Sequence, residues 1–302
     1  MLKGAVVKGF GDCKWGLQEN IWGTEKSING EIQNMNIVQK HIHYLLEKDQ
    51  RLDGRKLDEF RKDISIEYGI SPNSAEGSAR VKLGDTQVVA GVKFEVITPY
   101  PDQPDKGTIM AGVELLPLSS PDFESGPPSI KAVELARAVV DRGIRESGAI
   151  DFKGLCIKKE EKAWAVLIDV YSLNDDGNLA DAIGLCALAA LKDAKFPKYD
   201  EKNNKIIYEE STNKGLTLKE LPIPITVVKI KDKILVDPTL DEEEAVDSRL
   251  TVTTLEDGRV CAMQKGGKEP LSAEDTDKMI ELGIKKGKEL RKILEKGSPK
   301  EK

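Results

Sequence analysis

The stretch EGSARVKLGDTQVVAGVKFEV, residues 76–96, decides how the first part of this chain folds. Before its midpoint, apolar and basic residues alternate (Ala79, Arg80, Val81, Lys82 and Leu83). This period of two is typical of a strand that buries one face and exposes the other to water. Gly84-Asp85 separates two such runs and favours a tight turn between antiparallel strands. The sequence therefore predicts a β-hairpin over Ser78–Val96.

A second hairpin is predicted near the other end of the chain. Residues 248–255 and 259–264 both have the composition of strands, and Glu256-Asp257-Gly258 between them favours a turn. The segments RVKLGDTQVVAGVKFEV and RLTVTTLEDGRVCAMQK therefore share one strand–turn–strand pattern. This pair is the best sign of an internal duplication in the chain.

Strands are followed by helices twice over in the predicted element order. A strand over residues 109–116 precedes a helix over Ile130–Ser147, whose apolar stripe would consist of Val133, Ala136, Val140 and Ile144. Strands over residues 155–159 and 163–172 precede a helix over residues 179–191, which is apolar on all sides and should be buried. A last helix is expected over residues 272–295. This order predicts an α+β fold of two similar halves.

The predicted elements divide the chain into segments. A helix is expected over residues 35–49, an N-terminal half over about 50–150 and a C-terminal half over about 151–295. Residues 198–219 are polar and lysine-rich, which favours an excursion over the surface. Three alternatives stay open for the extension at residues 1–34: a mis-assigned start, an ordered extension and a disordered arm. The lack of a sustained pattern there favours the first and the third.

Composition restricts the possible functions. The chain has 302 residues and a formal charge of −6, so any contact with nucleic acid must be local or shared with a partner. Its two histidines lie close together at His41 and His43, which argues against a Ser-His-Asp or Cys-His mechanism. Its four cysteines are far apart, which argues against a zinc site. No apolar run approaches membrane-spanning length, and we expect a cytoplasmic protein.

Two acidic segments are candidates for chemistry. The turn at residues 237–244 contains five carboxylates, which could hold Mg²⁺ or could form a solvated acidic start of a helix. The loop LNDDGN (173–178) precedes the apolar helix and could bind an anion at the helix N-terminus. It could equally be a turn with Asn178 as the N-cap. The residue types favour the structural interpretation in both cases.

Three arginines on the helix over Ile130–Ser147 are candidates for binding phosphates. Arg137, Arg142 and Arg145 spread over about 140° of the helix surface opposite the apolar stripe. Arginine can hold a phosphate through two parallel hydrogen bonds. Acidic residues at positions 134, 141 and 146 are close enough to pair with them. A phosphate-binding face and a face of internal ion pairs are therefore equally open.

Several segments together resemble the RNase PH family. They are RLDGR (51–55), EGSARVKLGDTQVVAGVKFEV (76–96), ELARAVVDRGIRESGAID (134–151), the LNDDGN loop with its helix (173–196) and ILVDPTLDEEE (234–244). Their details resemble the larger, non-catalytic RNase PH-like subunit of the archaeal exosome. This resemblance implies an RNase PH-like fold of two similar halves over residues 35–302.

The resemblance also implies partners. The expected assembly is a hetero-hexameric ring in which three copies of this chain alternate with three copies of a catalytic RNase PH-like subunit. RNA-binding cap subunits would join the ring, and single-stranded RNA would be degraded from its 3′ end with phosphate. The resemblance places Arg137, Arg142 and Arg145 either along the RNA path or at the interface between subunits.

Departures from the active relatives imply that this chain has no catalytic residue of its own. Asn178 and Leu179 stand where active relatives carry a Thr-Arg-Ser segment that binds the attacking phosphate. Asp237 matches the first of two aspartates six residues apart, and Glu243 replaces the second. We therefore expect degenerate active-site positions, no metal, no cofactor and no enzymatic activity of the chain by itself.

Two other functions stay open as alternatives. The chain could be an active phosphorolytic 3′-exoribonuclease that works as a homo-oligomer, with Asp237 and Glu243 at its acid site. It could also be an unrelated small-molecule enzyme built on the same fold, because one fold serves many chemistries. The missing phosphate ligands argue against the first, and the number of matching segments argues against the second.

Overall fold

The computed structural model describes residues 36–297, apart from the side chains of residues 209–211. The alternatives for residues 1–34 concern a segment outside the described residues. Within residues 36–297, no helix combines the length and the apolar character needed to cross a bilayer.

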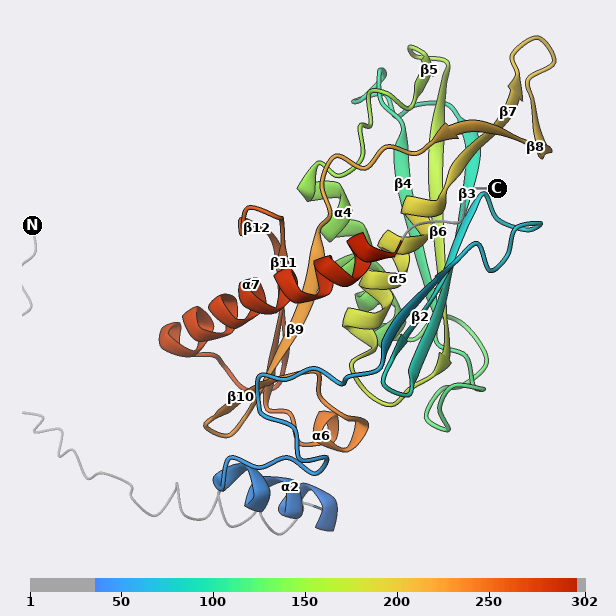
Figure 1. Cartoon of the computed structure of the whole chain (residues 1–302). Coiled ribbons are helices and arrows are strands. Elements are labelled where there is room, and N and C mark those ends of the chain that lie inside the picture. Colours follow the sequence, from blue (N-terminus) through green and yellow to red (C-terminus); the bar gives the residue numbers. More distant parts are fainter. Residues whose placement is uncertain (1–35, 298–302) are drawn as a thin grey trace, which may run out of the picture.

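The first sheet has six strands and contains the hairpin predicted near the N-terminus (Figure 1). Its strand order is β1-β2-β3-β6-β4, and β5 pairs with β6. β2 (Gly77–Leu83) and β3 (Thr86–Ile97) pair antiparallel, which confirms that hairpin. The remaining strands are β1 (Ile64–Tyr68), β4 (Thr108–Glu114), β5 (Cys156–Lys158) and β6 (Lys162–Asn174). β4 runs parallel to β6, and the other pairs are antiparallel.

The second sheet has four antiparallel strands in the order β10-β9-β11-β12. They are β9 (Ile223–Ile230), β10 (Lys233–Val236), β11 (Ser248–Thr254) and β12 (Val260–Gly267). Pairing of β11 with β12 confirms the second predicted hairpin. The expected boundary between halves near residue 150 does not follow the sheets, because β6 lies inside the first one. β6 is apolar along most of its length, as expected for a central strand that is covered on both faces.

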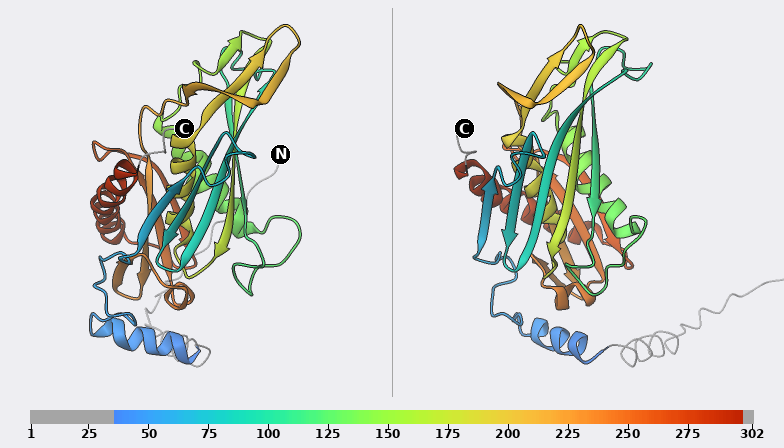
Figure 2. Two further views of the ribbon diagram at one scale, coloured as in Figure 1. Left: turned by 45° about the vertical axis from the view of Figure 1, so that its right-hand side comes forward. Right: turned by 90° about the vertical axis from the view of Figure 1, so that its right-hand side faces the viewer.

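Two helices and two sheets alternate in layers (Figure 2). Helix α5 (Leu179–Asp193) lies between the sheets and contacts β2, β3 and β9. It is buried along most of its length, as predicted. Helix α7 (Ala273–Lys296) covers the opposite face of the second sheet. On β9 the side chain of Ile225 lies beside Gly287 of α7, whereas that of its neighbour Pro224 lies beside Gly184 of α5, and successive side chains of a strand point to opposite faces. The N-terminus of α5 thereby points at the turn after β10.

The predicted helix over Ile130–Ser147 is present but is not α-helical throughout. It consists of α3 (Ile130–Glu134), the π-helical segment η1 (Leu135–Asp141) and α4 (Arg142–Ser147). The predicted apolar stripe is wrong at Val133, which is 43% exposed, whereas Leu135 and Val139 are buried. A π-helical turn is wider than an α-helical turn, so the buried face is rotated relative to the α-helical expectation.

Smaller elements complete the fold. The expected surface excursion is an ordered two-stranded ribbon, β7 (Lys195–Asp200) and β8 (Lys205–Gly215), because Phe196 and Tyr199 on β7 pack against Trp164. Helix α2 (Ile37–Glu47) packs on the second sheet through Ile42 and Leu46, where the sequence predicts a helix over residues 35–49. It lies beside the short helix α6 (Leu240–Glu244), as Figure 1 shows.

Candidate functional site

The N-terminus of α5 meets the turn after β10, and this junction brings together Asn178, Asp237 and Glu243. The chain passes through it in a left-handed conformation, with φ of +85° at Gly177, +57° at Asn178 and +51° at Asp237. A Cβ atom on Gly177 would lie 2.5 Å from the carbonyl oxygen of Pro238. Only glycine combines this φ with so close an approach of two backbone segments.

The carboxylate of Asp237 is buried and accepts five hydrogen bonds. Three come from Arg61, through its backbone N–H (2.7 Å), Nε (3.1 Å) and Nη2 (2.8 Å). The others come from Nη1 of Arg55 (2.7 Å) and Nδ2 of Asn178 (2.9 Å). Burial would raise the pKa of Asp237, but the hydrogen bonds and charge of Arg61 outweigh it and hold the pKa below its ordinary value. A carboxylate has about four lone-pair sites, so none is left for a metal ion.

Three arginines hold this turn in place, and sequence reasoning gave none of them a role. Arg51 is fully buried and donates to both carboxylate oxygens of Glu242, at 2.9 and 2.5 Å. Arg55 and Arg61 bind Asp237, and Arg61 also binds Asp176 at 3.0 Å. Their partners lie more than 100 residues further along the chain. The RLDGR segment marked Arg51 and Arg55 without indicating their partners, and nothing in the sequence marked Arg61.

The side chain of Asn178 turns into the protein instead of capping α5. Its Nδ2 donates to Asp237 and to Oδ2 of Asp181 (3.1 Å). Asn178 occupies the N-cap position, as predicted, but its side chain makes no capping hydrogen bond. The oxygen that would accept a backbone N–H in a cap, Oδ1, has no hydrogen-bond partner among the described residues. Asp181 is fully buried and also accepts from the backbone N–H of Thr226 at 2.7 Å. Burial raises the pKa of Asp181 to about 8.

Glu243 brings a carboxylate to the N-terminus of α5. Its Oε1 accepts the backbone N–H of Asn178 at 2.7 Å. Nζ of Lys131 lies 4.0 Å from Oε2 of Glu243 and 3.6 Å from Asp175. Burial raises the pKa of Glu243, and the nearby Lys131 opposes that shift. A helix N-terminus attracts anions, and here a side chain of the protein itself takes that position.

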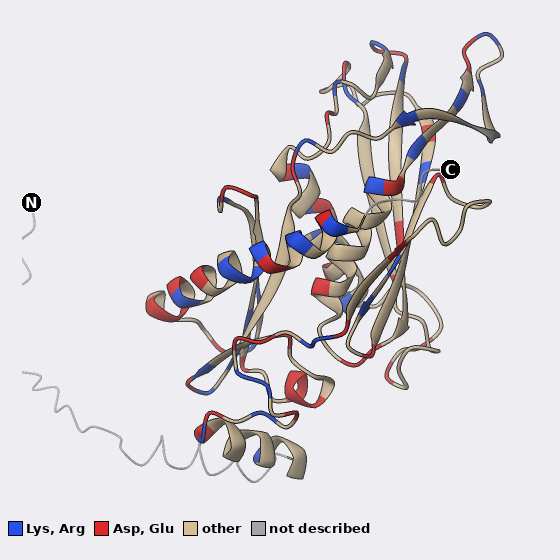
Figure 3. Ribbon diagram, in the orientation of Figure 1, with Lys and Arg blue, Asp and Glu red and all other residues tan. Residues whose placement is uncertain are grey.

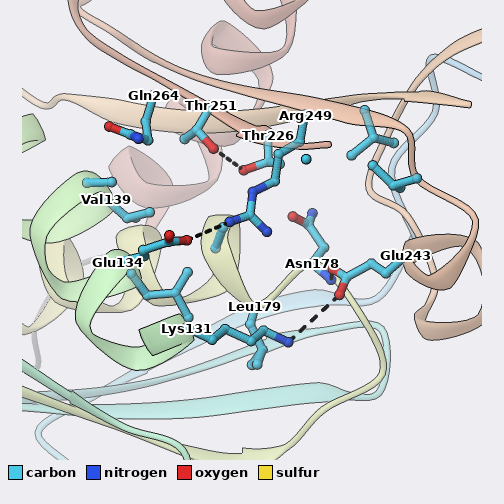
Figure 4. Close-up of a pocket in the computed structure, with 16 residues that line it drawn as sticks. Lys131, Glu134, Val139, Asn178, Leu179, Thr226, Glu243, Arg249, Thr251 and Gln264 are labelled. Carbon is cyan, nitrogen blue, oxygen red and sulfur yellow. Dashed lines mark hydrogen bonds and ion pairs between the residues drawn. The ribbon is translucent and has the colours of Figure 1, made fainter. Parts of the chain in front are cut away.

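A pocket of about 170 Å³ opens beside this junction (Figure 4). Its walls come from α3 and η1, the first turn of α5 and the second sheet. Lys131 and Arg249 reach into it toward carboxylates of the protein, and Nη2 of Arg249 lies 3.0 Å from Glu134. The degenerate positions Asn178, Leu179 and Glu243 all line it. Each cation of the pocket therefore already has an internal counter-charge.

The three arginines predicted to bind RNA differ in their contacts. Arg145 donates to Asp141 (2.6 Å) and to the carbonyl oxygen of Ile109 (2.8 Å), so its guanidinium is bound to the chain itself. Arg142 bonds to Gln264 on β12 at 3.0 Å. Arg137 lines a different hollow beside β4 and β6, and no hydrogen bond or ion pair holds it among the described side chains. Figure 3 likewise shows Lys and Arg interspersed with Asp and Glu along the ribbon.

The carboxylates of this junction are bound mainly to other groups of the protein. Among residues 36–297, no group of three or more His, Cys, Asp or Glu side chains is arranged to hold a metal ion. Asp237 has no free oxygen, and Glu243 occupies the anion position of α5. The second oxygen of Glu243, Oε2, lies 4.0 Å from Nζ of Lys131.

Comparison with known proteins assigns most of the chain to one family. Residues 59–197 match domain 1, and residues 220–286 match domain 2, of the 3′ exoribonuclease family called RNase PH. An exosome complex component Rrp42 from Methanocella arvoryzae is 49% identical over 259 residues, which cover 86% of this chain and 96% of that protein. The protein of the same name from Thermococcus gammatolerans is 48% identical over 260 residues, covering 85% and 94% of the two chains.

Solved structures of exosome chains are also similar to this chain over most of its length. A chain of the Archaeoglobus fulgidus exosome with RNA bound to the active site superposes with a TM-score of 0.78 at 43% identity. That match covers 85% of this chain and 97% of the other. A chain of an archaeal exosome core superposes with a TM-score of 0.75 at 40% identity, covering 86% and 96%.

Proposed function

We propose that this chain, which belongs to the 3′ exoribonuclease (RNase PH) family, is a ring subunit of an exosome that does not catalyse phosphorolysis by itself. Its similarity to proteins named exosome complex component Rrp42, over nearly their whole length, supports the assignment to an exosome. Its task would be to support a catalytic RNase PH-like partner and to help position single-stranded RNA for degradation from the 3′ end with phosphate.

The hydrogen bond from the backbone N–H of Asn178 to Glu243 is the observation that carries the non-catalytic assignment. A phosphorolytic enzyme must bind inorganic phosphate as the nucleophile and stabilise charge on the transferred phosphoryl group. At this helix N-terminus a carboxylate would repel a phosphate. The cations of the adjacent pocket, Lys131 and Arg249, are paired with acidic side chains. Neither of them has a positive charge left over to offset that repulsion.

The partners follow from family membership and belong to the same proposal. The ring would contain three copies of this chain and three copies of the catalytic subunit, and RNA-binding cap subunits would attach to it. The formal charge of −6 is compatible with RNA binding only if the basic contacts are local, as in a pore shared with partners.

Nucleoside diphosphate release from a single-stranded oligoadenylate tests the proposal. With phosphate and Mg²⁺, we expect no release by the purified chain alone and sustained release after the catalytic partner is added. Glu243→Gln in this chain should change the rate of the assembled complex by less than about twofold, whereas loss of a general acid or base costs about 10²–10⁴-fold. Release by the isolated chain that is abolished by Glu243→Gln would instead favour the active homo-oligomer.

RNA affinity of the assembled ring tests the predicted arginines. We expect Arg137→Ala with Arg142→Ala to weaken binding and to reduce the slope of log affinity against log salt by about 0.7 for each phosphate group that the protein no longer neutralises. Arg145→Ala should add little, because its guanidinium is committed to Asp141 and Ile109. Lys278→Ala with Lys285→Ala, two exposed cations of α7, is the matched control. An unchanged salt slope in the double arginine variant would show that these residues do not touch RNA.

A further inference from the structure

The pocket at the start of α5 contains a buried hydrogen-bond acceptor without a donor. Oδ1 of Asn178 has no hydrogen-bond partner among the described residues, and the residue is only 1% exposed. The amide cannot be turned round to remove this defect, because its Nδ2 donates to the ionised carboxylate of Asp237, and a turned amide would place Oδ1 against that negative charge. Buried polar groups in proteins are nearly always paired, so a donor from outside the described chain is expected at this position.

The pocket has the size and the walls for a planar ring. Its volume is about 170 Å³, and an apolar cavity of about 150 Å³ in a protein is known to hold benzene. Leu135, Val139 and Leu179 supply apolar walls, and the hydroxyl groups of Thr226 and Thr251, 3.0 Å apart, supply a polar one. Figure 4 shows the side chains of Asn178, Leu179 and Arg249 around the same space.

The charges around the pocket favour a neutral ring over a free anion. Lys131 is balanced by Glu243 and Asp175, and Arg249 is balanced by Glu134. An inorganic phosphate would have to break these pairs and would meet the carboxylate of Glu243. A neutral heteroaromatic ring breaks no ion pair, and the flat guanidinium of Arg249 can stack on such a ring.

We propose that this pocket binds an amino-bearing nucleobase, whose exocyclic N–H group donates to Oδ1 of Asn178. A nucleobase supplies both the planar ring and the missing donor. This inference rests on the proposed function in one respect only, namely that the chain meets RNA. It adds that the pocket at the degenerate positions binds a nucleotide without degrading it.

Binding of nucleosides to the full chain, measured by calorimetry and by ligand-observed NMR, tests the inference. Adenosine should bind, and purine riboside, which lacks the amino group, should bind at least tenfold more weakly. Inorganic phosphate should not compete with adenosine. Equal affinity for adenosine and purine riboside would overturn the proposed hydrogen bond. Absence of adenosine binding at millimolar concentration would overturn the whole proposal, and a water molecule would then be the partner of Asn178.

Three variants locate the binding site of adenosine. Ala138→Leu narrows the pocket and should abolish adenosine binding, whereas Ala111→Leu, in the hollow beside β4 and β6, should leave it unchanged. Asn178→Gly tolerates the positive φ and removes Oδ1, so adenosine and purine riboside should then bind equally. Adenosine binding that persists in Ala138→Leu would place the nucleoside elsewhere. These readouts are independent of nucleoside diphosphate release, so the failure of either proposal can be recognised separately.

Discussion

Replacing Arg51 by methionine is expected to lower the free energy of unfolding by about 3–5 kcal/mol, because it leaves a buried carboxylate without its partner. The side chains of Arg51 and Glu242 are 0% and 1% exposed and are joined by two hydrogen bonds. Arg51 also donates to the backbone carbonyl oxygens of Val236 and Asp237. Denaturant unfolding of the full chain, followed by circular dichroism, measures the effect.

Two further variants separate the broken ion pair from the change in side-chain volume. Arg51→Met with Glu242→Gln should recover a substantial part of the stability, because the second change removes the unpaired charge and keeps an acceptor for the backbone N–H of Thr239. Arg259→Met breaks a pair with Asp257 whose side chains are 67% and 52% exposed, and it should cost less than about 1 kcal/mol. Equal losses of stability in Arg51→Met and Arg259→Met would contradict a structural role for the buried pair.

Replacing Gly177 by alanine is the other change with a large expected effect. Its φ of +85° costs an alanine about 1–2 kcal/mol. The added Cβ would lie 2.5–2.6 Å from backbone atoms of Pro238, Thr239 and Leu240, which adds about 1–3 kcal/mol of overpacking. We therefore expect a total loss of about 2–5 kcal/mol in the free energy of unfolding, measured as for Arg51.

Gly148→Ala is the matched control for this substitution. Gly148 has a similar φ of +71°, but a Cβ added there would meet no atom within 4 Å. It should therefore lose only the conformational part, about 1–2 kcal/mol. If the two variants were equally stable, the close approach of the two segments at Gly177 would not exist in solution.

Local pattern alone predicted much of the fold. Alternation over Ala79–Leu83 with Gly84-Asp85 gave the first hairpin, and the run of apolar residues from Leu179 gave the buried helix. Both signals are contained in a few neighbouring residues, and the backbone geometry of strands and helices converts them directly into structure. The same reasoning failed at Val133, because nothing in the local sequence marks a π-helical turn.

The candidate site was predicted only as a set of positions. The resemblance named Asn178, Leu179, Asp237 and Glu243, and the structure brings Asn178, Asp237 and Glu243 into direct hydrogen-bonded contact. The resemblance did not indicate that Arg55 and Arg61 would bind the oxygens of Asp237. It also did not indicate that Glu243 would accept the backbone N–H of Asn178. Nor did the resemblance distinguish Arg145, whose guanidinium is hydrogen-bonded to Asp141 and Ile109, from Arg137, which has no such bond among the described side chains.

The sequence by itself therefore determined the order and type of the elements, because these depend on short-range periodicity and turn chemistry. Only the tertiary structure decided what the degenerate positions do. Arg61 reaches Asp237 across 176 residues of chain, and Asn178 reaches Glu243 across 65. The type of a charged residue limits the groups that it can bind. Its actual partner depends on which groups the packing of the two sheets against α5 brings together and buries.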